Sequence, residues 1–127
     1  MKEYQTLLSY IEYFTEPSNN FFKWSEFKKD EDGVIALPYC SYSERVLEFQ
    51  KAVYDTGFVF KGNYAQGVTE KENPLEFIEN CDLETLRKLL TFFIRRERFC
   101  EGMLASAIKN GFILKILERL KELLDGQ

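Results

Sequence analysis

The stretch DLETLRKLLTFFIRRERFCEGMLASAIKNGFILKILERLKELL, residues 82–124, decides the fold of this chain. Apolar residues recur along it every three or four positions, the spacing that places side chains on one face of a helix. Asp82 marks a helix start, because its side chain accepts a hydrogen bond from the free N–H groups there. Gly102 interrupts the pattern. We predict helices over 82–98 and 112–124, with a short helix between them, and a core built from the two long ones.

Three further helices are predicted upstream. Apolar residues at helical spacing cover 4–14 and end before a proline. Ser41 and Glu44 have the spacing of a capping box, in which a hydroxyl and a carboxylate three residues later satisfy each other's backbone N–H groups. The helix that follows this box should run to about Thr56. A third, short helix over 75–80 is opened by a proline, which needs no N–H at that position.

We predict that the segments between these helices are irregular or extended. Residues 17–33 hold several aromatics around a charged loop, and we expect an irregular region there, with a short helix as the alternative. The apolar run 34–40 is broken by Pro38, as in an extended segment or an edge strand. Residues 58–68 contain a Gly-Asn turn signal and predict a small hairpin or an extended loop. Taken together, the patterns predict a mainly α fold, α+β at most: one compact helical domain over residues 1–127 with a small central β-hairpin or extended segment.

Composition limits the class of protein. The chain has 127 residues, 45% of them hydrophobic, which is enough for one domain with its own core. Its formal charge is −4, and only residues 82–127 carry a small basic excess, so nucleic acid is an unlikely partner. Three cysteines at no metal-ligand spacing, with neither a signal peptide nor a membrane-length apolar run, predict a cytoplasmic protein with no membrane contact. We expect no metal and no cofactor.

The chain contains no histidine. Histidine is the commonest general base near neutral pH and the commonest neutral metal ligand. Ser–His and Cys–His catalysis within one chain are therefore excluded, and no other catalytic constellation is visible. The sequence favours a protein that is not an enzyme.

A candidate ligand site lies in the segment RRERFCEG at 95–102. Arg95 and Arg98 share one face if the helix continues through residue 98, and two guanidiniums so spaced can grip a phosphate or carboxylate. The alternative is a salt-bridge cluster with Glu97, Glu101 or the acidic N-terminal half, which would fix the helix end to the rest of the domain. Cys100 follows this basic segment. It is either a reactive thiol or a buried structural cysteine, and buried structural cysteines are the commoner case in proteins.

Aromatic residues could complete such a site by stacking on a ligand, or could form a second hydrophobic cluster. The candidate ligand-binding residues are Arg95, Arg98, Cys100, Trp24, Tyr39 and Tyr42. No catalytic residue is assigned.

Two segments carry a resemblance to a known family. They are LPYCSYSERVLEFQKAVYDTGF at 37–58 and the stretch at 82–123. The more specific parts are Leu37-Pro38-Tyr39 with Tyr42, the run LRKLLT, and Arg98-Phe99-Cys100 with Gly102. This pattern resembles the bacterial family known as domain of unknown function 6508, over about residues 37–123. The resemblance implies a shared fold and a bacterial or phage origin. Relatives often have a histidine where this chain has Met103; if the family were catalytic through that histidine, this member would be inactive.

Three hypotheses of function follow from these features. The first is a non-catalytic protein-interaction module, with a protein partner or homo-oligomer, that uses the aromatic loop or the apolar face of the last helix at Leu120 and Leu124. The second is a module for a small anionic ligand or nucleotide held by Arg95 and Arg98. The third and weakest is a helix-turn-helix-type nucleic-acid binder built from the last two helices. Its phosphate contacts would come from Lys109, Lys115, Arg119 and Lys121.

Overall fold

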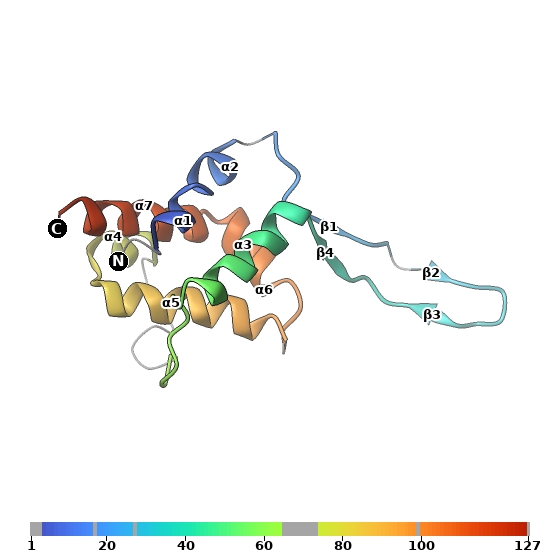
Figure 1. Cartoon of the computed structure of the whole chain (residues 1–127). Coiled ribbons are helices and arrows are strands. Elements are labelled where there is room, and N and C mark those ends of the chain that lie inside the picture. The colour runs from blue at the N-terminus through green and yellow to red at the C-terminus, as the bar shows by residue number, and fades with distance from the viewer. Residues whose placement is uncertain (1–3, 17, 27, 65–73, 99, 127) are drawn as a thin grey trace.

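The computed structural model describes residues 4–16, 18–26, 28–64, 74–98 and 100–126. Its elements, in chain order, are α1 (Gln5–Leu8), α2 (Ile11–Thr15), β1 (Phe22–Trp24), β2 (Lys28–Lys29), β3 (Ile35–Ala36), β4 (Cys40–Tyr42), α3 (Glu44–Asp55), α4 (Pro74–Asn80), α5 (Leu83–Arg96), α6 (Met103–Lys109) and α7 (Phe112–Asp125). The helices form a body around one core, and the strands form an arm that leaves it (Figure 1). The predicted mainly α fold with a small β-hairpin is confirmed.

The C-terminal helices α5, α6 and α7 follow the predicted pattern. The Asp82 carboxylate accepts a hydrogen bond of 2.8 Å from the Thr85 N–H and so caps α5. Gly102 and Gly111 precede α6 and α7 with φ of +91° and +82°, a backbone conformation that other residues rarely adopt. The two glycines therefore make the tight turns that fold the three helices onto one another.

The apolar face of α7 belongs to the core. Leu117 and Leu120 are fully buried and Leu124 is almost so. Helices α1, α2, α4, α5 and α6 all contact α7. The hypothesis that Leu120 and Leu124 form an interaction surface is therefore wrong, because neighbouring helices of the same chain already cover that face.

Helix α3 completes the body and begins at Ser43. The Ser43 side chain accepts a hydrogen bond of 3.2 Å from the Val46 N–H, and Val46 and Phe49 are fully buried. The predicted capping box started two residues too early, at Ser41. That residue lies in β4, because the chain stays paired with β1 as far as Tyr42.

Residues 58–68 were predicted as a hairpin or an extended loop, and the hairpin is absent from the described part of that segment, which ends at residue 64. Phe58 and Val59 are buried, and the Arg87 guanidinium donates hydrogen bonds of 3.0 Å and 3.2 Å to their carbonyl groups. Arg87 also donates to the Gly57 carbonyl at 3.2 Å. A side chain of α5 thus satisfies the backbone groups that a partner strand would otherwise bind. Residues 65–68 lie outside the described part.

The single N-terminal helix predicted over 4–14 is divided into α1 and α2. The Ser9 hydroxyl donates to the Thr6 carbonyl at 2.8 Å, and the Tyr10 N–H donates to the Leu7 carbonyl at 3.2 Å. These short-range bonds tighten the chain at 9–10 and end α1. Both halves nevertheless bury their apolar residues against the core, as the spacing predicted.

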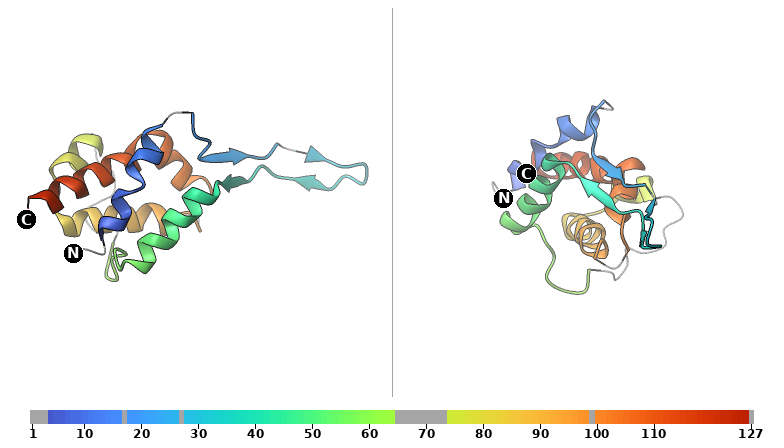
Figure 2. Two further views of the ribbon diagram at one scale, coloured as in Figure 1. Left: turned by 45° about the horizontal axis from the view of Figure 1, so that its top comes forward. Right: turned by 90° about the vertical axis from the view of Figure 1, so that its right-hand side faces the viewer.

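The strands form a two-stranded antiparallel arm, here called the β-arm, whose described residues are 22–26 and 28–42. Phe22 lies opposite Tyr42 and Trp24 opposite Cys40 in the inner pair, whereas β2 pairs with β3 in the outer pair. The arm projects well beyond the helices, and the C-terminal end of α7 lies at the opposite end of the body (Figures 1 and 2). The prediction of an extended or edge segment over 34–40 is confirmed in β3 and β4, and the pairing of β1 with β4 was not predicted.

The tip of the β-arm, residues 30–33, is a turn held by Asp30. The Asp30 carboxylate accepts hydrogen bonds from the N–H groups of Asp32 at 3.0 Å and Val34 at 2.8 Å. Gly33 has φ of +83° and donates its N–H to the Asp30 carbonyl at 3.1 Å. A type I turn closed by a left-handed glycine is a common hairpin connection.

Among the described residues, no helix combines the length and the hydropathy needed to cross a membrane.

Candidate functional site

The β-arm carries most of the large apolar side chains that the described residues leave in solvent. Their exposed fractions are 44% for Trp24, 63% for Val34, 52% for Ile35, 70% for Leu37 and 56% for Tyr39. Three others lie on the helices, at Leu47, Tyr54 and Leu75. Single exposed apolar residues are ordinary on a protein surface, whereas a group of them on one projecting element is a candidate interaction site.

A hydrogen-bonded anchor, formed by Tyr42 and Glu97, holds the base of the β-arm (residues 22–24 and 40–42) to the body. The Tyr42 hydroxyl donates to the Glu97 carboxylate and accepts from the Ala105 N–H at 3.0 Å. Burial, followed by the hydrogen bond to Glu97, raises the pKa of Tyr42 above its usual value of about 10. Tyr42 therefore stays neutral and keeps its proton for the carboxylate.

Glu97 also shapes the loop between α5 and α6. Both of its carboxylate oxygens accept hydrogen bonds from the Gly102 N–H, at 2.8 Å and 2.9 Å. An ionised carboxylate that binds N–H and O–H donors makes a stronger hydrogen bond than a neutral acceptor. The same carboxylate thus orders the α5–α6 loop and attaches β4 to it, so its lone pairs are engaged in structure.

A second hydrogen bond joins β4 to the α5–α6 loop, at Glu101, the residue before Gly102. The Glu101 carboxylate accepts a hydrogen bond of 2.8 Å from the Cys40 N–H, which is on the edge of β4 away from β1. Burial, to which the nearby carboxylates of Glu97 and Glu101 add, raises the pKa of the Cys40 thiol. The inner end of β4 is therefore covered by the body rather than open for strand pairing.

Trp24 packs on the backbone of Gly102. A Cβ atom placed on Gly102 would lie 2.4 Å from Cζ2 of Trp24, far inside van der Waals contact. The positive φ of Gly102 gives a second, independent reason for glycine at this position. The indole and the glycine together fix the direction in which β1 leaves the body.

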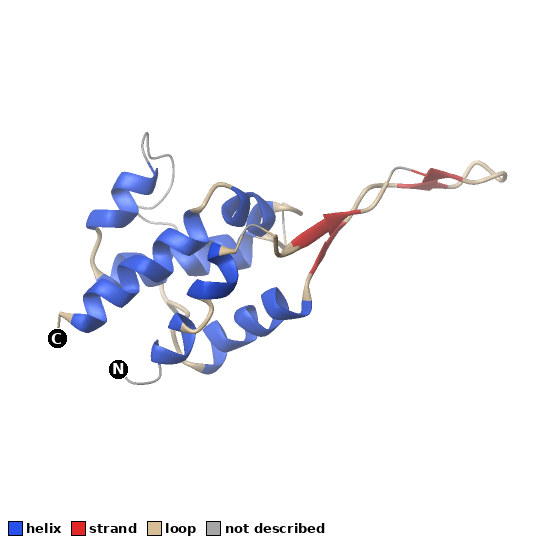
Figure 3. Ribbon diagram, turned by 90° about the horizontal axis from the view of Figure 1, so that it is seen from above, coloured by secondary structure: helices blue, strands red, loops and turns tan. Residues whose placement is uncertain are grey.

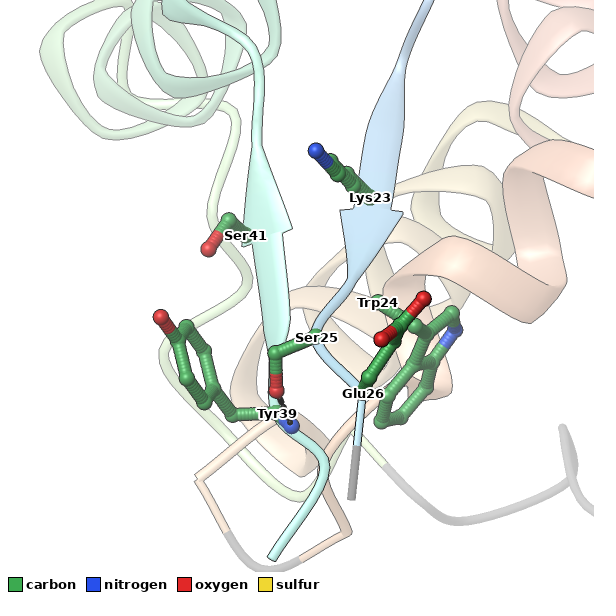
Figure 4. Close-up of a pocket in the computed structure, with 6 residues that line it drawn as sticks. All are labelled: Lys23, Trp24, Ser25, Glu26, Tyr39 and Ser41. Carbon is green, nitrogen blue, oxygen red and sulfur yellow. Dashed lines mark hydrogen bonds between the residues drawn. The ribbon is translucent and has the colours of Figure 1, made fainter. Parts of the chain in front are cut away.

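The arm also lines an open hollow of about 360 Å³ (Figure 4). Its lining residues are Lys23, Trp24, Ser25, Glu26, Tyr39 and Ser41. Successive residues of a strand point to opposite faces, and Trp24 is paired with Cys40, so Trp24 and Tyr39 belong to opposite faces of the strand pair. Figure 4 shows their rings on opposite sides. The two aromatics do not form one stacking platform.

The structure distributes the six candidate ligand residues over two neighbouring elements. Trp24, Tyr39 and Tyr42 all lie on the β-arm, and the other three lie at the end of α5 or in the loop after it. Tyr42 is turned toward Glu97, whereas Trp24 and Tyr39 are exposed. The sequence thus singled out the arm and its anchor loop. That these residues bind an anion together stays a prediction.

Arg95 and Arg98 do not share a helix face, because α5 ends at Arg96. The Arg95 guanidinium lies 5.7 Å from the centre of the Tyr64 ring, and Arg98 is exposed in the turn that follows. Neither takes part in an ion pair among the described residues. The alternative reading, a salt-bridge cluster with Glu97 or Glu101, is not seen there either, since those carboxylates bind the arm and the loop.

The three cysteines differ in exposure. Cys81 is buried, Cys40 is half-buried and Cys100 is exposed. The reading of Cys100 as a buried structural cysteine is therefore wrong. It lies in the α5–α6 loop, where its N–H donates to the Arg96 carbonyl at 2.8 Å while its side chain faces solvent.

Two of the four cations proposed to contact phosphate in the helix-turn-helix hypothesis are bound to other groups of the domain. Lys115 forms an ion pair of 2.5 Å with Glu79 of α4. Arg119 donates a hydrogen bond of 3.0 Å to the Cys81 carbonyl and pairs with Glu122 at 3.3 Å. These two cations attach α7 to the segment that precedes α5, so they are engaged inside the domain.

Comparison with known proteins places the chain in one family. The model of a family of unknown function, DUF6508, matches residues 1–126, which extends the resemblance seen over 37–123 to the N-terminal helices and the whole β-arm. No curated protein and no solved structure matches the chain. The protein therefore belongs to the family of unknown function DUF6508.

Proposed function

We propose that this protein is a non-catalytic protein-interaction module that docks through its β-arm, and that it works in the cytoplasm of a bacterial or phage-infected cell. The observation that carries the proposal is the exposure of five large apolar side chains on one two-stranded arm. Figure 3 shows that this arm leaves the helical body. The five side chains are those of Trp24, Val34, Ile35, Leu37 and Tyr39. All three cysteines are free, as is usual in a reducing compartment.

The architecture of the arm supports docking. A two-stranded hairpin without a third strand or a covering helix is only marginally stable in water. The outer pair, β2 with β3, extends away from the helices (Figures 1 and 3). Its open edges and exposed apolar side chains are features that proteins commonly cover by binding another chain. A partner would supply the packing that the body does not give to this half of the arm.

Because its base is anchored to the body, the arm is ordered before it binds a partner. Tyr42 is bound to Glu97, Cys40 to Glu101, and Trp24 packs on Gly102. A surface that is already ordered loses less conformational entropy on binding, so more of the contact energy appears as affinity. The body therefore supports the arm in a way that suits recognition.

The residues of the anchor also favour a role without catalysis. The chain has no histidine, and the Tyr42–Glu97 pair is saturated by hydrogen bonds within the domain. A catalytic base needs access to the proton that it removes. The most polar cluster at the arm is thus better suited to holding structure than to turning over a substrate.

Photo-crosslinking tests the proposal directly. A photoreactive phenylalanine analogue is placed at Leu37 on the arm or, as a matched control, at the exposed Leu75 on α4. After irradiation in the organism that makes the protein, the Leu37 position should give discrete crosslinked protein species that the Leu75 position does not. Equal yields at the two positions, or no adduct at Leu37, would refute docking through the arm.

A further inference from the structure

We infer that the partner of the β-arm is a second copy of this chain, with the two arms lying side by side and antiparallel. In this dimer the acidic tip of each arm meets the basic base of the other. The inference rests on the proposed function, because it takes the arm as the docking surface and adds the identity of the partner. Three features carry it: the charges, the length and the apolar side chains of the arm.

The two ends of the arm carry opposite charge. The tip holds three consecutive acidic residues, and while the Asp30 carboxylate is used inside the turn, Glu31 and Asp32 are exposed. At the base, Lys23 of β1 and Lys109 at the end of α6 are exposed; Lys109 lies with Trp24 on one face of the strand pair, and Lys23 points to the other face. None of these four groups belongs to an ion pair within the described part of the chain. Each end is thus left with charges that the other end would neutralise.

Because of the hairpin geometry, the acidic tip and the basic base can meet only between two copies of the chain. A strand rises roughly 3.3 Å per residue, so the tip lies on the order of 30 Å from the base and cannot fold back to meet it. Two equal arms related by a two-fold axis place every tip beside the partner's base, and each contact occurs twice. The same register brings Glu26 of one arm near Lys29 of the other.

The apolar side chains fit the same arrangement. Val34 and Ile35 lie near the tip and Trp24 lies at the base, so the antiparallel register sets the two groups against each other. Leu37 and Tyr39, between them, lie near the two-fold axis. Beside Trp24 the base also offers a hollow of about 300 Å³ bordered by Ser106 and Lys109.

Sedimentation equilibrium of charge-reversed variants of the full chain tests the inference. One variant reverses the tip (E31K with D32K), a second reverses the base (K23E with K109E), and a third combines all four changes. Like charges placed together weaken association, so the tip and base variants should each raise the dimer Kd at least about tenfold, and the combination should restore it to within a few-fold. K121E on α7, at the far end of the body from the arm, is the control and should leave the Kd unchanged.

Zero-length carbodiimide crosslinking of a mixture of ¹⁴N- and ¹⁵N-labelled chains adds a positional readout. Mixed-isotope peptides that join Glu31 or Asp32 to Lys23 or Lys109 are expected. Far-ultraviolet circular dichroism of each variant shows that the body remains folded, since every changed residue is exposed.

Three results would overturn the inference. They are a monomer at all concentrations, a dimer whose Kd is the same in the wild type and in the tip and base variants, or a combined variant whose dimer Kd is higher than that of the tip or the base variant. The first result is compatible with the proposed function if Leu37 still crosslinks to a different protein. Absence of both the dimer and the Leu37 adduct would remove the proposed function as well.

Discussion

The Tyr42 hydroxyl donates a hydrogen bond to the Glu97 carboxylate and thereby joins β4 to the end of α5, 55 residues later in the chain. The same hydroxyl accepts the Ala105 N–H at the start of α6. One phenol thus connects the β-arm, the α5–α6 loop and the first turn of α6. The orientation of the arm follows from this junction, and several measurable consequences depend on it.

Replacing Tyr42 by phenylalanine should destabilise the protein by about 1–3 kcal/mol, because the Ala105 N–H and the Glu97 carboxylate each lose a partner. The free energy of unfolding in urea measures the effect. Tyr39→Phe is the matched control, since that ring is exposed and its loss of a hydroxyl should change stability by less than about 0.5 kcal/mol. Equal effects of the two changes would argue against the anchor.

Gly102→Ala should both destabilise the fold and displace the arm. The new Cβ would lie 2.4 Å from the Trp24 ring, and the positive φ adds strain of about 1 kcal/mol or more. Gly111→Ala has comparable backbone strain with nothing within 4 Å of the new Cβ, so it isolates the contribution of the indole contact. Trp24 is the single tryptophan, and its fluorescence emission should shift in the Gly102 variant only. An unchanged spectrum would contradict the packing of Trp24 on Gly102.

Leu120→Ala should cost about 2–5 kcal/mol of stability, because the fully buried side chain would leave a cavity in the core. Leu47→Ala on α3 removes an exposed leucine and should change stability by less than about 0.5 kcal/mol. Thermal and urea unfolding distinguish the two. If the Leu120 variant were as stable as the Leu47 variant, Leu120 would not be part of the core, and the apolar face of α7 would again be a candidate interaction surface.

The three thiols should react with iodoacetamide in a fixed order, with Cys100 first, Cys40 slower and Cys81 last. Cys100 is exposed, whereas Cys81 is buried and burial raises its pKa to about 11, so little thiolate forms near neutral pH. Burial also raises the pKa of Cys40. Alkylation followed over time by peptide mass spectrometry gives the three rates, and rapid modification of Cys81 in the folded protein would show that its site opens.

The helices of the body were predictable because their signals are local. The periodicity of residues 82–124, the Asp82 cap and Gly102 each depend on neighbours within a few positions. The position of the hairpin was not predictable in this way. Its strands have two or three residues each, too few for an alternating pattern, and their pairing depends on contacts between segments well apart in the chain. At Phe58 and Val59 the apolar run looked like a strand, but Arg87 binds the carbonyl groups there.

The candidate site was predicted in part for the same reason. Trp24, Tyr39 and Tyr42 were chosen as aromatics and all lie on the arm, but nothing in the sequence separates the exposed pair from the anchoring Tyr42. Glu97 and Glu101 were considered only as salt-bridge partners for nearby arginines. Their real partners, Tyr42 and the Cys40 N–H, are distant in sequence, and an acidic residue beside arginines gives no sign of such contacts.

The most direct test of the β-arm as the docking surface is native mass spectrometry of the protein purified from the organism that makes it. The wild type is compared with Ile35→Lys/Leu37→Lys on the arm and with Leu47→Lys, an exposed leucine on α3. The wild type and the Leu47 variant should carry the same bound chain, either a second copy or another protein, and the arm variant should appear as a folded monomer. An arm variant that keeps its partner, or a Leu47 variant that loses it equally, would contradict docking through the arm.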